Sequence, residues 1–261
     1  MRYLRLLREQ LRRSLLLALQ YRADFALEGL TSLFFTATAL VPLFVVYGDR
    51  ASIAGWQFGE ALIVTGFFTL LGGVLEGAIN PSLATVVEHI RKGTLDLVLL
   101  KPADAQFLVS TQRFLPWRAT AIPVALVIFI VGFGKLGRAP AFLDIVAAGI
   151  LFAAAILIVY SLWIMVVSAA FYVVKMDNLT YLLSSIFDAA RWPAAVFRGA
   201  LAFVFTFVIP LALMTTYPAE ALLDRMDTWR LFAALGGAIV FAGLARLVWL
   251  RALGRYTSAG G

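Results

Sequence analysis

The feature that most constrains the fold of this chain is a series of long apolar runs separated by short polar stretches. Hydrophobic residues make up 62% of its 261 residues, against roughly 45–50% in an average soluble domain. A helix needs about 20 apolar residues to cross about 30 Å of hydrocarbon, and several runs reach that length. The sequence therefore predicts an all-α, polytopic transmembrane bundle that occupies residues 1–261 as a single domain.

The apolar runs divide into six predicted spans, and the basic residues give them an orientation. The spans cover residues 26–47, 58–79, 119–137, 143–172, 197–217 and 231–251. Seventeen of the 22 lysines and arginines flank the side that holds both termini, and five flank the other side. Because cytoplasmic loops carry the excess of basic residues, both termini and residues 80–118 are predicted to face the cytoplasm. The net charge of +7 is then a consequence of topology, and we expect no nucleic-acid partner.

Residues 1–25 have the pattern of an amphipathic helix that lies in the membrane interface. Arginines occupy one face, and leucines occupy the other. A cationic face opposite an apolar face is typical of helices that bind the surface of a bilayer. We therefore expect membrane lipid to be a partner of this segment.

A polar island over residues 87–102 interrupts the apolar sequence between the second and third spans. It predicts a helix that ends at Gly93, followed by a short helix that Pro102 stops. Thr94 is placed to cap the second helix, and Leu95, Leu99 and Leu100 should form its apolar stripe. Such an element can dock a partner protein, although the same pattern also suits a plain connecting loop.

The connection between the fifth and sixth spans is too apolar for a free outer loop. Pro210 interrupts the fifth span, and Tyr217-Pro218 follows within an apolar stretch. One interpretation is a broken or re-entrant segment, because irregular backbone is tolerated where protein or water covers it. A proline-kinked span followed by an interfacial helix is the other.

The side chains offer little catalytic chemistry. The chain has no cysteine and one histidine, His89, which we expect to be a solvated loop residue. Gly132-Phe-Gly134-Lys135 lacks the upstream glycine and the hydroxyl residue of a phosphate-binding loop. We therefore expect no ATPase site, no metal and no cofactor in this chain. Three acids near span ends, Glu28, Glu60 and Glu76, keep open the alternative of an ion-coupled secondary transporter; a non-transporting scaffold is a third reading.

The order of these features resembles the type-2 permease family of ATP-binding cassette (ABC) exporters, in particular its bacterial six-span branch. The resemblance rests on Glu88 with Gly93-Thr94-Leu95-Asp96 and Lys101-Pro102, on Phe187-x-x-x-Arg191-Trp192-Pro193, on Tyr217-Pro218, and on the tail Arg255-Tyr-Thr-Ser-Ala-Gly-Gly261. At Ile90-Arg91-Lys92 the sequence differs from the motif that is commoner in this family.

The resemblance implies a function and a set of partners. It implies that residues 80–118 form a cytoplasmic coupling loop, and that Glu88, Gly93, Thr94, Leu95 and Asp96 dock an ABC ATPase. It also implies a second permease subunit, identical or paralogous, beside this one in the bacterial plasma membrane, and a cytoplasmic ATPase that binds ATP and Mg²⁺. The scarcity of charge within the spans predicts an amphiphilic substrate, such as a lipid, a glycolipid, a drug-like compound or a peptide.

Overall fold

Long apolar helices run side by side through the structure, which is a computed structural model that describes residues 2–20, 22–48, 50–172, 185, 187–205 and 210–256. Within those residues, four helices are long and apolar enough to cross a membrane. They are Phe58–Lys92, Pro116–Leu136, Phe142–Phe171 and Thr228–Leu253. These helices match the predicted second, third, fourth and sixth spans, and they confirm a polytopic helical membrane protein.

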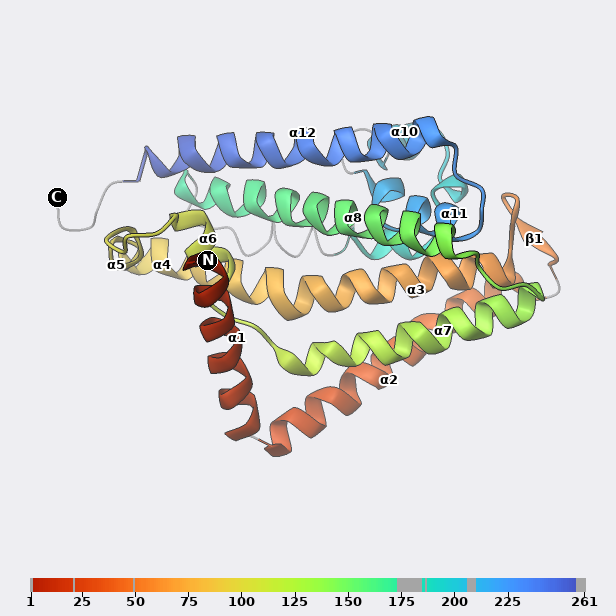
Figure 1. Cartoon of the computed structure of the whole chain (residues 1–261), viewed down its shortest axis with the longest axis horizontal. Coiled ribbons are helices and arrows are strands. Elements are labelled where there is room, and N and C mark those ends of the chain that lie inside the picture. Colours follow the sequence, from red (N-terminus) through yellow and green to blue (C-terminus); the bar gives the residue numbers. More distant parts are fainter. Residues whose placement is uncertain are drawn as a thin grey trace.

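The chain enters this bundle through two helices that meet at a sharp corner (Figure 1). The first, α1 (Arg2–Gln20), runs across the direction of the long helices, and the second, α2 (Arg22–Tyr47), coincides with the first predicted span. The interfacial helix is therefore shorter than residues 1–25, because residues 22–25 already belong to α2. A two-residue turn then joins β1 (Ser52–Ile53) to β2 (Trp56–Gln57) in an antiparallel hairpin.

The second span continues without a break beyond the predicted boundary at residue 79. It consists of α3 (Phe58–Val74), the π-helical turn η1 (Leu75–Ile79) and α4 (Asn80–Lys92). The third span combines η2 (Pro116–Thr120) with α7 (Ala121–Leu136) and runs antiparallel to α3. Gly59 lies against Leu136 near one end of this pair, and the Gly77 carbonyl accepts a hydrogen bond from Leu115 N–H (2.8 Å) at the other. The stretch 58–79 is thus level with the third span, and α4 projects beyond it.

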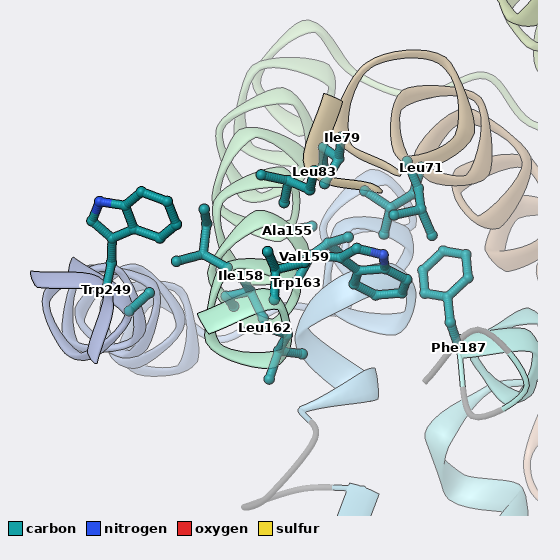
Figure 2. Packing of buried hydrophobic residues seen from close by; sticks show 14 of the residues in the cluster. Leu71, Ile79, Leu83, Ala155, Ile158, Val159, Leu162, Trp163, Phe187 and Trp249 are labelled. Carbon is teal, nitrogen blue, oxygen red and sulfur yellow. The ribbon is translucent and has the colours of Figure 1, made fainter. Parts of the chain in front are cut away.

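The hydrophobic core lies between the long helices α8 (Phe142–Ser168), α12 (Thr228–Leu253), and α3 with its extension. Figure 2 shows Trp163 of α8 beside Phe187, and Trp249 of α12 on the side of α8 near Ile158. Both tryptophans are almost fully buried. The outward faces of α7 and α12 instead carry exposed apolar side chains such as Ile130 (71%) and Ile239 (69%). Exposed apolar surface of this extent fits helices that face lipid.

The region of the predicted fifth span forms no continuous long helix among the described residues. It contains α10 (Ala200–Phe203) and then, beyond residues 206–209, η7 (Ala212–Thr216) and α11 (Tyr217–Leu222). The stretch 197–217 is not among the four membrane-length helices of the described residues, and the predicted interruption at Pro210 lies within it, because proline has no N–H to continue a helix. The remaining short elements are α5 (Asp96–Leu99), α6 (Ala105–Ser110), η3 (Ala169–Phe171), η4 (Asp188–Arg191) and η5 (Ala194–Val196).

Candidate coupling site

The end of α4 and the following short helix form a protruding tip at the same end of the bundle as α1 and the end of α12 (Figure 1). The helix α4 ends at Gly93, whose φ of 65° lies in the left-handed region that glycine adopts without strain. Gly93 N–H and Thr94 N–H donate to the carbonyls of Ile90 (3.2 Å) and His89 (2.9 Å). These bonds cap the end of α4 and turn the chain into α5. The predicted helix–glycine–helix arrangement is confirmed.

Two details of the tip differ from the prediction. The Thr94 hydroxyl does not cap α5; it pairs with Nδ1 of His89 at 2.7 Å. His89 is therefore a half-buried residue in the last turn of α4, and the expectation of a solvated loop histidine is wrong. The contact explains the error, because the turn at Gly93 folds Thr94 back over the histidine.

The leucines of the tip divide into a buried set and an exposed set. Leu95 is fully buried and packs with Val98 in the main core. By contrast, Leu97 is 65% exposed and Leu100 is 81% exposed. The predicted stripe of Leu95, Leu99 and Leu100 is therefore wrong, because Leu95 attaches the tip to the bundle. The apolar surface that a partner protein can reach is formed mainly by Leu97 and Leu100, with a smaller contribution from Leu99 (37%).

The acidic residues of the tip are Glu88 and Asp96. Glu88 is exposed on α4 and pairs with Lys92 one turn later (2.5 Å). The hydrogen bond from Lys92 lowers the pKa of Glu88. Asp96 begins α5, and its charge, after burial, contributes to the raised pKa of Tyr256 just beyond α12. The tip therefore lies close to the C-terminal end of the last span; the tail residues 257–261, which contribute to the family resemblance, lie outside the described residues.

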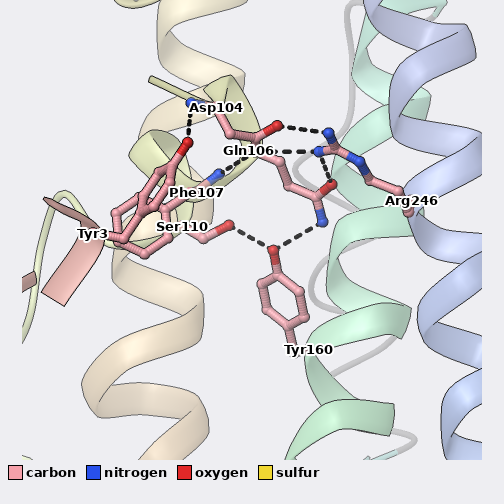
Figure 3. Close-up of polar contacts among 7 residues, drawn as sticks. All are labelled: Tyr3, Asp104, Gln106, Phe107, Ser110, Tyr160 and Arg246. Carbon is pink, nitrogen blue, oxygen red and sulfur yellow. Dashed lines mark hydrogen bonds and ion pairs between the residues drawn. The ribbon is translucent and has the colours of Figure 1, made fainter. Parts of the chain in front are cut away.

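A polar cluster behind the tip connects α6 to two long helices (Figure 3). Asp104 accepts two hydrogen bonds from Arg246 of α12 (2.6 and 3.2 Å), and Gln106 accepts a third (2.8 Å). The Gln106 amide donates to the Tyr160 hydroxyl of α8 (2.9 Å), which also pairs with Ser110 (2.8 Å). We call these five residues the clamp. Sequence reasoning missed it, because Arg246 is distant in sequence and was counted only as a topological charge.

Asp104 also has a local role, since it caps α6 by accepting from Phe107 N–H (2.9 Å). Burial raises the pKa of Asp104, but the hydrogen bond and charge of Arg246, together with the Phe107 N–H, lower it more. Asp104 is therefore held as a carboxylate. The Tyr3 hydroxyl accepts from Asp104 N–H (3.3 Å), and the Tyr3 ring packs edge-on against Phe107. The interfacial helix α1 is thus attached to the same cluster.

The segment that leads from α6 into the third span is extended and fastened along its length. The Ser82 hydroxyl of α4 donates to the Arg113 carbonyl (2.6 Å), and Phe114 N–H donates to the Ser14 hydroxyl of α1 (3.2 Å). This segment therefore connects α4, α1 and the third span.

The predicted ion-coupling acids have different environments. Glu60 is buried (3% exposed), accepts from Gln57 N–H at the start of α3, and pairs with Arg225 at 2.7 Å. Glu76 lies in η1, next to Gly77 and therefore level with the start of the third span. Glu28 is exposed on α2. The described residues contain no group of histidine, cysteine or acidic side chains that could hold a metal ion.

The predicted broken segment is packed against the bundle. Pro210 is buried before η7, Tyr217 begins α11 directly after η7, and Pro218 occupies the first turn of α11. The Thr215 hydroxyl donates to the Ala190 carbonyl (2.6 Å), and Ala194 N–H donates to the Thr216 hydroxyl (3.1 Å). Whether this segment re-enters the bilayer or lies at its surface stays a prediction.

Four membrane-length helices among the described residues, with a tip fastened to the bundle at one end, define a multi-pass membrane protein. A comparison with protein-family models identifies the family to which the chain belongs. A model described as ABC-2 family transporter protein matches residues 33–260, so the chain belongs to the ABC-2 transporter family and is the permease subunit of an ABC transporter. The family implies an ABC ATPase as partner. Comparisons with curated proteins and with solved structures gave no match.

Proposed function

We propose that this permease is half of an ATP-driven exporter that moves an amphiphilic substrate across the bacterial plasma membrane. The tip docks the ABC ATPase through the exposed side chains of Leu97 and Leu100, next to Glu88 and Asp96. ATP and Mg²⁺ bind in the ATPase, and a second permease, identical or paralogous, completes the transporter. The observation that carries the proposal is the tip itself, which exposes apolar side chains while the clamp fastens its base to α8 and α12.

The connections of the tip suggest how ATPase closure moves the spans. The tip is the end of the 35-residue helix Phe58–Lys92, so a push on it acts directly on the second span. Through Asp104 and Arg246 it also acts on α12, and through Gln106 and Tyr160 on α8. A displacement of one rigid element that several spans share can shift an inward-open state toward an outward-open one.

An apolar groove between α3, α7 and α8 supports an amphiphilic substrate. Its volume is about 850 Å³, and its walls include Phe67, Phe129 and Phe152. Arg138 lies at one end of the groove, beyond the third span. An apolar surface with a cation at its end suits a molecule that has a hydrocarbon part and a polar head.

Transport in proteoliposomes tests the energy source. We expect the permease with its ATPase to transport in the presence of an ionophore that collapses ion gradients, and to stop without ATP. Neutralising Glu28 and Glu76 to glutamine should leave this transport largely intact, because both acids lie at the depth of span ends. Glu60→Gln serves as a separate variant, since its pair with Arg225 makes a loss of thermal stability the expected effect. Transport that needs a gradient, proceeds without ATP and disappears in Glu76→Gln would instead show that the protein is an ion-coupled secondary transporter.

Cysteine labelling tests the orientation. The chain has no native cysteine, so Lys92→Cys at the exposed end of α4 gives a single reactive site. We expect an impermeant thiol reagent to label it only after the cells are permeabilised. Arg50→Cys, beside the β1–β2 hairpin, is the matched control and should react in intact cells. The reverse pattern would show that the tip faces outward and that the proposed ATPase contact is wrong.

A further inference from the structure

A second pocket lies where α1 meets the beginning of the third span. Its volume is about 460 Å³, within the range of roughly 300–1,000 Å³ that small-molecule sites occupy. Leu11 and Leu15 of α1 form one wall, and Leu70, Ile122 and Phe152 contribute others. Leu11 (44%), Leu15 (48%) and Ile122 (54%) are partly exposed, so the pocket opens at the surface of the bundle.

Two glycines shape the inner wall of this pocket. Gly73 and Gly77 belong to α3 and η1, and both line it. A side chain at Gly73 would place its Cβ 2.5 Å from the Ala121 Cβ, and one at Gly77 would lie 3.0 Å from the Arg118 Cβ. The absence of a side chain at Gly73 and Gly77 therefore permits a close helix contact here. The glycines let the third span approach α3 while leaving no side chains to fill the space beside it.

Arg118 lines the pocket and carries a charge that no described residue pairs. Its Nε is buried and has no hydrogen-bond partner among the residues that the structure describes. Arg118 also forms no ion pair with a described residue. By contrast, Arg191, Arg225, Arg230 and Arg246 each pair with a carboxylate. A half-buried, unpaired guanidinium is costly unless an anion reaches it. Because Arg118 is the third residue of the third span, it lies at the depth of lipid headgroups.

The helix α1 adds further positive charge beside the pocket. Arg8 precedes Leu11 by three residues, and Arg12 precedes Leu15 by three, so each arginine neighbours a pocket-lining leucine on the helix surface. Both arginines are exposed. The pocket therefore combines apolar walls with the cation of Arg118, and Arg8 and Arg12 lie within one helical turn of its lining leucines. Figure 1 shows α1 running across the direction of the long helices, as a helix in the membrane interface does.

We propose that this pocket binds an anionic phospholipid of the bilayer. An acyl chain lies between α1 and the third span, and the lipid phosphate pairs with Arg118 and with the neighbouring arginines of α1. Guanidinium groups recognise phosphate through paired, charge-assisted hydrogen bonds. The phospholipid joins α1 to the third span and so supports the segment that carries the tip. The proposal requires only that the protein lies in a membrane, and it does not depend on the direction or substrate of transport.

Native mass spectrometry of the purified permease–ATPase complex tests this site by counting bound lipids. Phosphatidylglycerol and phosphatidylcholine are offered separately at equal concentration. We expect the wild-type protein to prefer phosphatidylglycerol, and Arg118→Gln to lose about tenfold in affinity for it, because one charge-assisted contact is removed. Arg118→Lys keeps the charge and should retain most of the preference. Arg251→Gln, at an exposed position on α12, is the matched control and should bind like the wild type.

A second variant distinguishes lipid from a protein occupant. Ile122→Trp fills the pocket without changing its charge, so we expect weaker binding of both lipids and an unchanged permease pair. If Arg118→Gln binds phosphatidylglycerol as the wild type does, the proposal is wrong. It is also wrong if Ile122→Trp leaves lipid binding unchanged but separates the two permeases, since the pocket would then be a permease–permease contact.

Discussion

Replacing both exposed leucines of the tip, in the variant Leu97→Asp with Leu100→Asp, will separate the permease from its ATPase and leave the membrane bundle folded. Each leucine that a docked partner buries contributes about 1.5–3 kcal/mol, and the two carboxylates would also have to lose water in the interface. The loss should therefore exceed a hundredfold in affinity. Co-purification of the ATPase with the permease, and ATP-driven transport in proteoliposomes, measure the effect.

Two further variants distinguish loss of docking from loss of folding. Ala84→Asp introduces one such carboxylate at an exposed position on α4 and should leave ATPase binding unchanged. Leu95→Ala should instead lower the thermal stability of the permease, because it removes a fully buried side chain at a cost of roughly 2–5 kcal/mol. Normal ATPase binding in the double aspartate variant would show that the tip is a plain connecting loop.

The second large effect is expected from the clamp. Arg246→Ala removes the guanidinium that holds Asp104 and Gln106 to α12. The contacts are charge-assisted, but Arg246 is 43% exposed and Asp104 is 35% exposed, so we expect a loss of only about 2 kcal/mol after allowance for solvent. The functional loss should be larger than the loss of stability. ATP hydrolysis would continue while transport falls more than tenfold, because movement of the tip no longer reaches α12.

The ratio of ATP hydrolysed to substrate moved is the measurement that checks this result. Arg251→Ala, one turn further along α12, keeps the clamp and should leave the ratio unchanged. Arg246→Lys keeps the charge but loses the two parallel bonds of the guanidinium, so an intermediate ratio is expected. An unchanged ratio in Arg246→Ala would show that α12 is not driven through the clamp.

The parts of the fold that the sequence predicted are those encoded locally. Apolar length placed the third, fourth and sixth spans and the start of the second within a few residues of the observed helices, and Gly93 marked the end of α4 because only a residue tolerant of positive φ fits there. The division of the tip leucines was not predictable in this way. Helical spacing alone does not say which side of a four-residue helix faces the bundle.

The contacts of the clamp could not be predicted from the sequence either, for a different reason. Asp104 is separated from Arg246 by 142 residues, and neither residue belongs to a motif. Only the packing of α6 against α8 and α12 brings them together. The fifth span differs from the clamp, since its interruption at Pro210 could be predicted from a residue that has no N–H to continue a helix, whereas its composition does not show how the backbone after Pro210 packs against the bundle.

The π-helical turn η1 has a consequence for the direction in which the tip points. In this turn Asn80 N–H bonds to the Leu75 carbonyl, five residues back, where an α-helix would bond four back. Each residue advances an α-helix by about 100°. A chain with one residue fewer in this turn would rotate all of α4 by that angle about its axis and carry Leu97 and Leu100 to another side of the bundle. The direction in which Leu97 and Leu100 face around the axis of α4 is therefore set at η1, about 20 residues earlier in the chain.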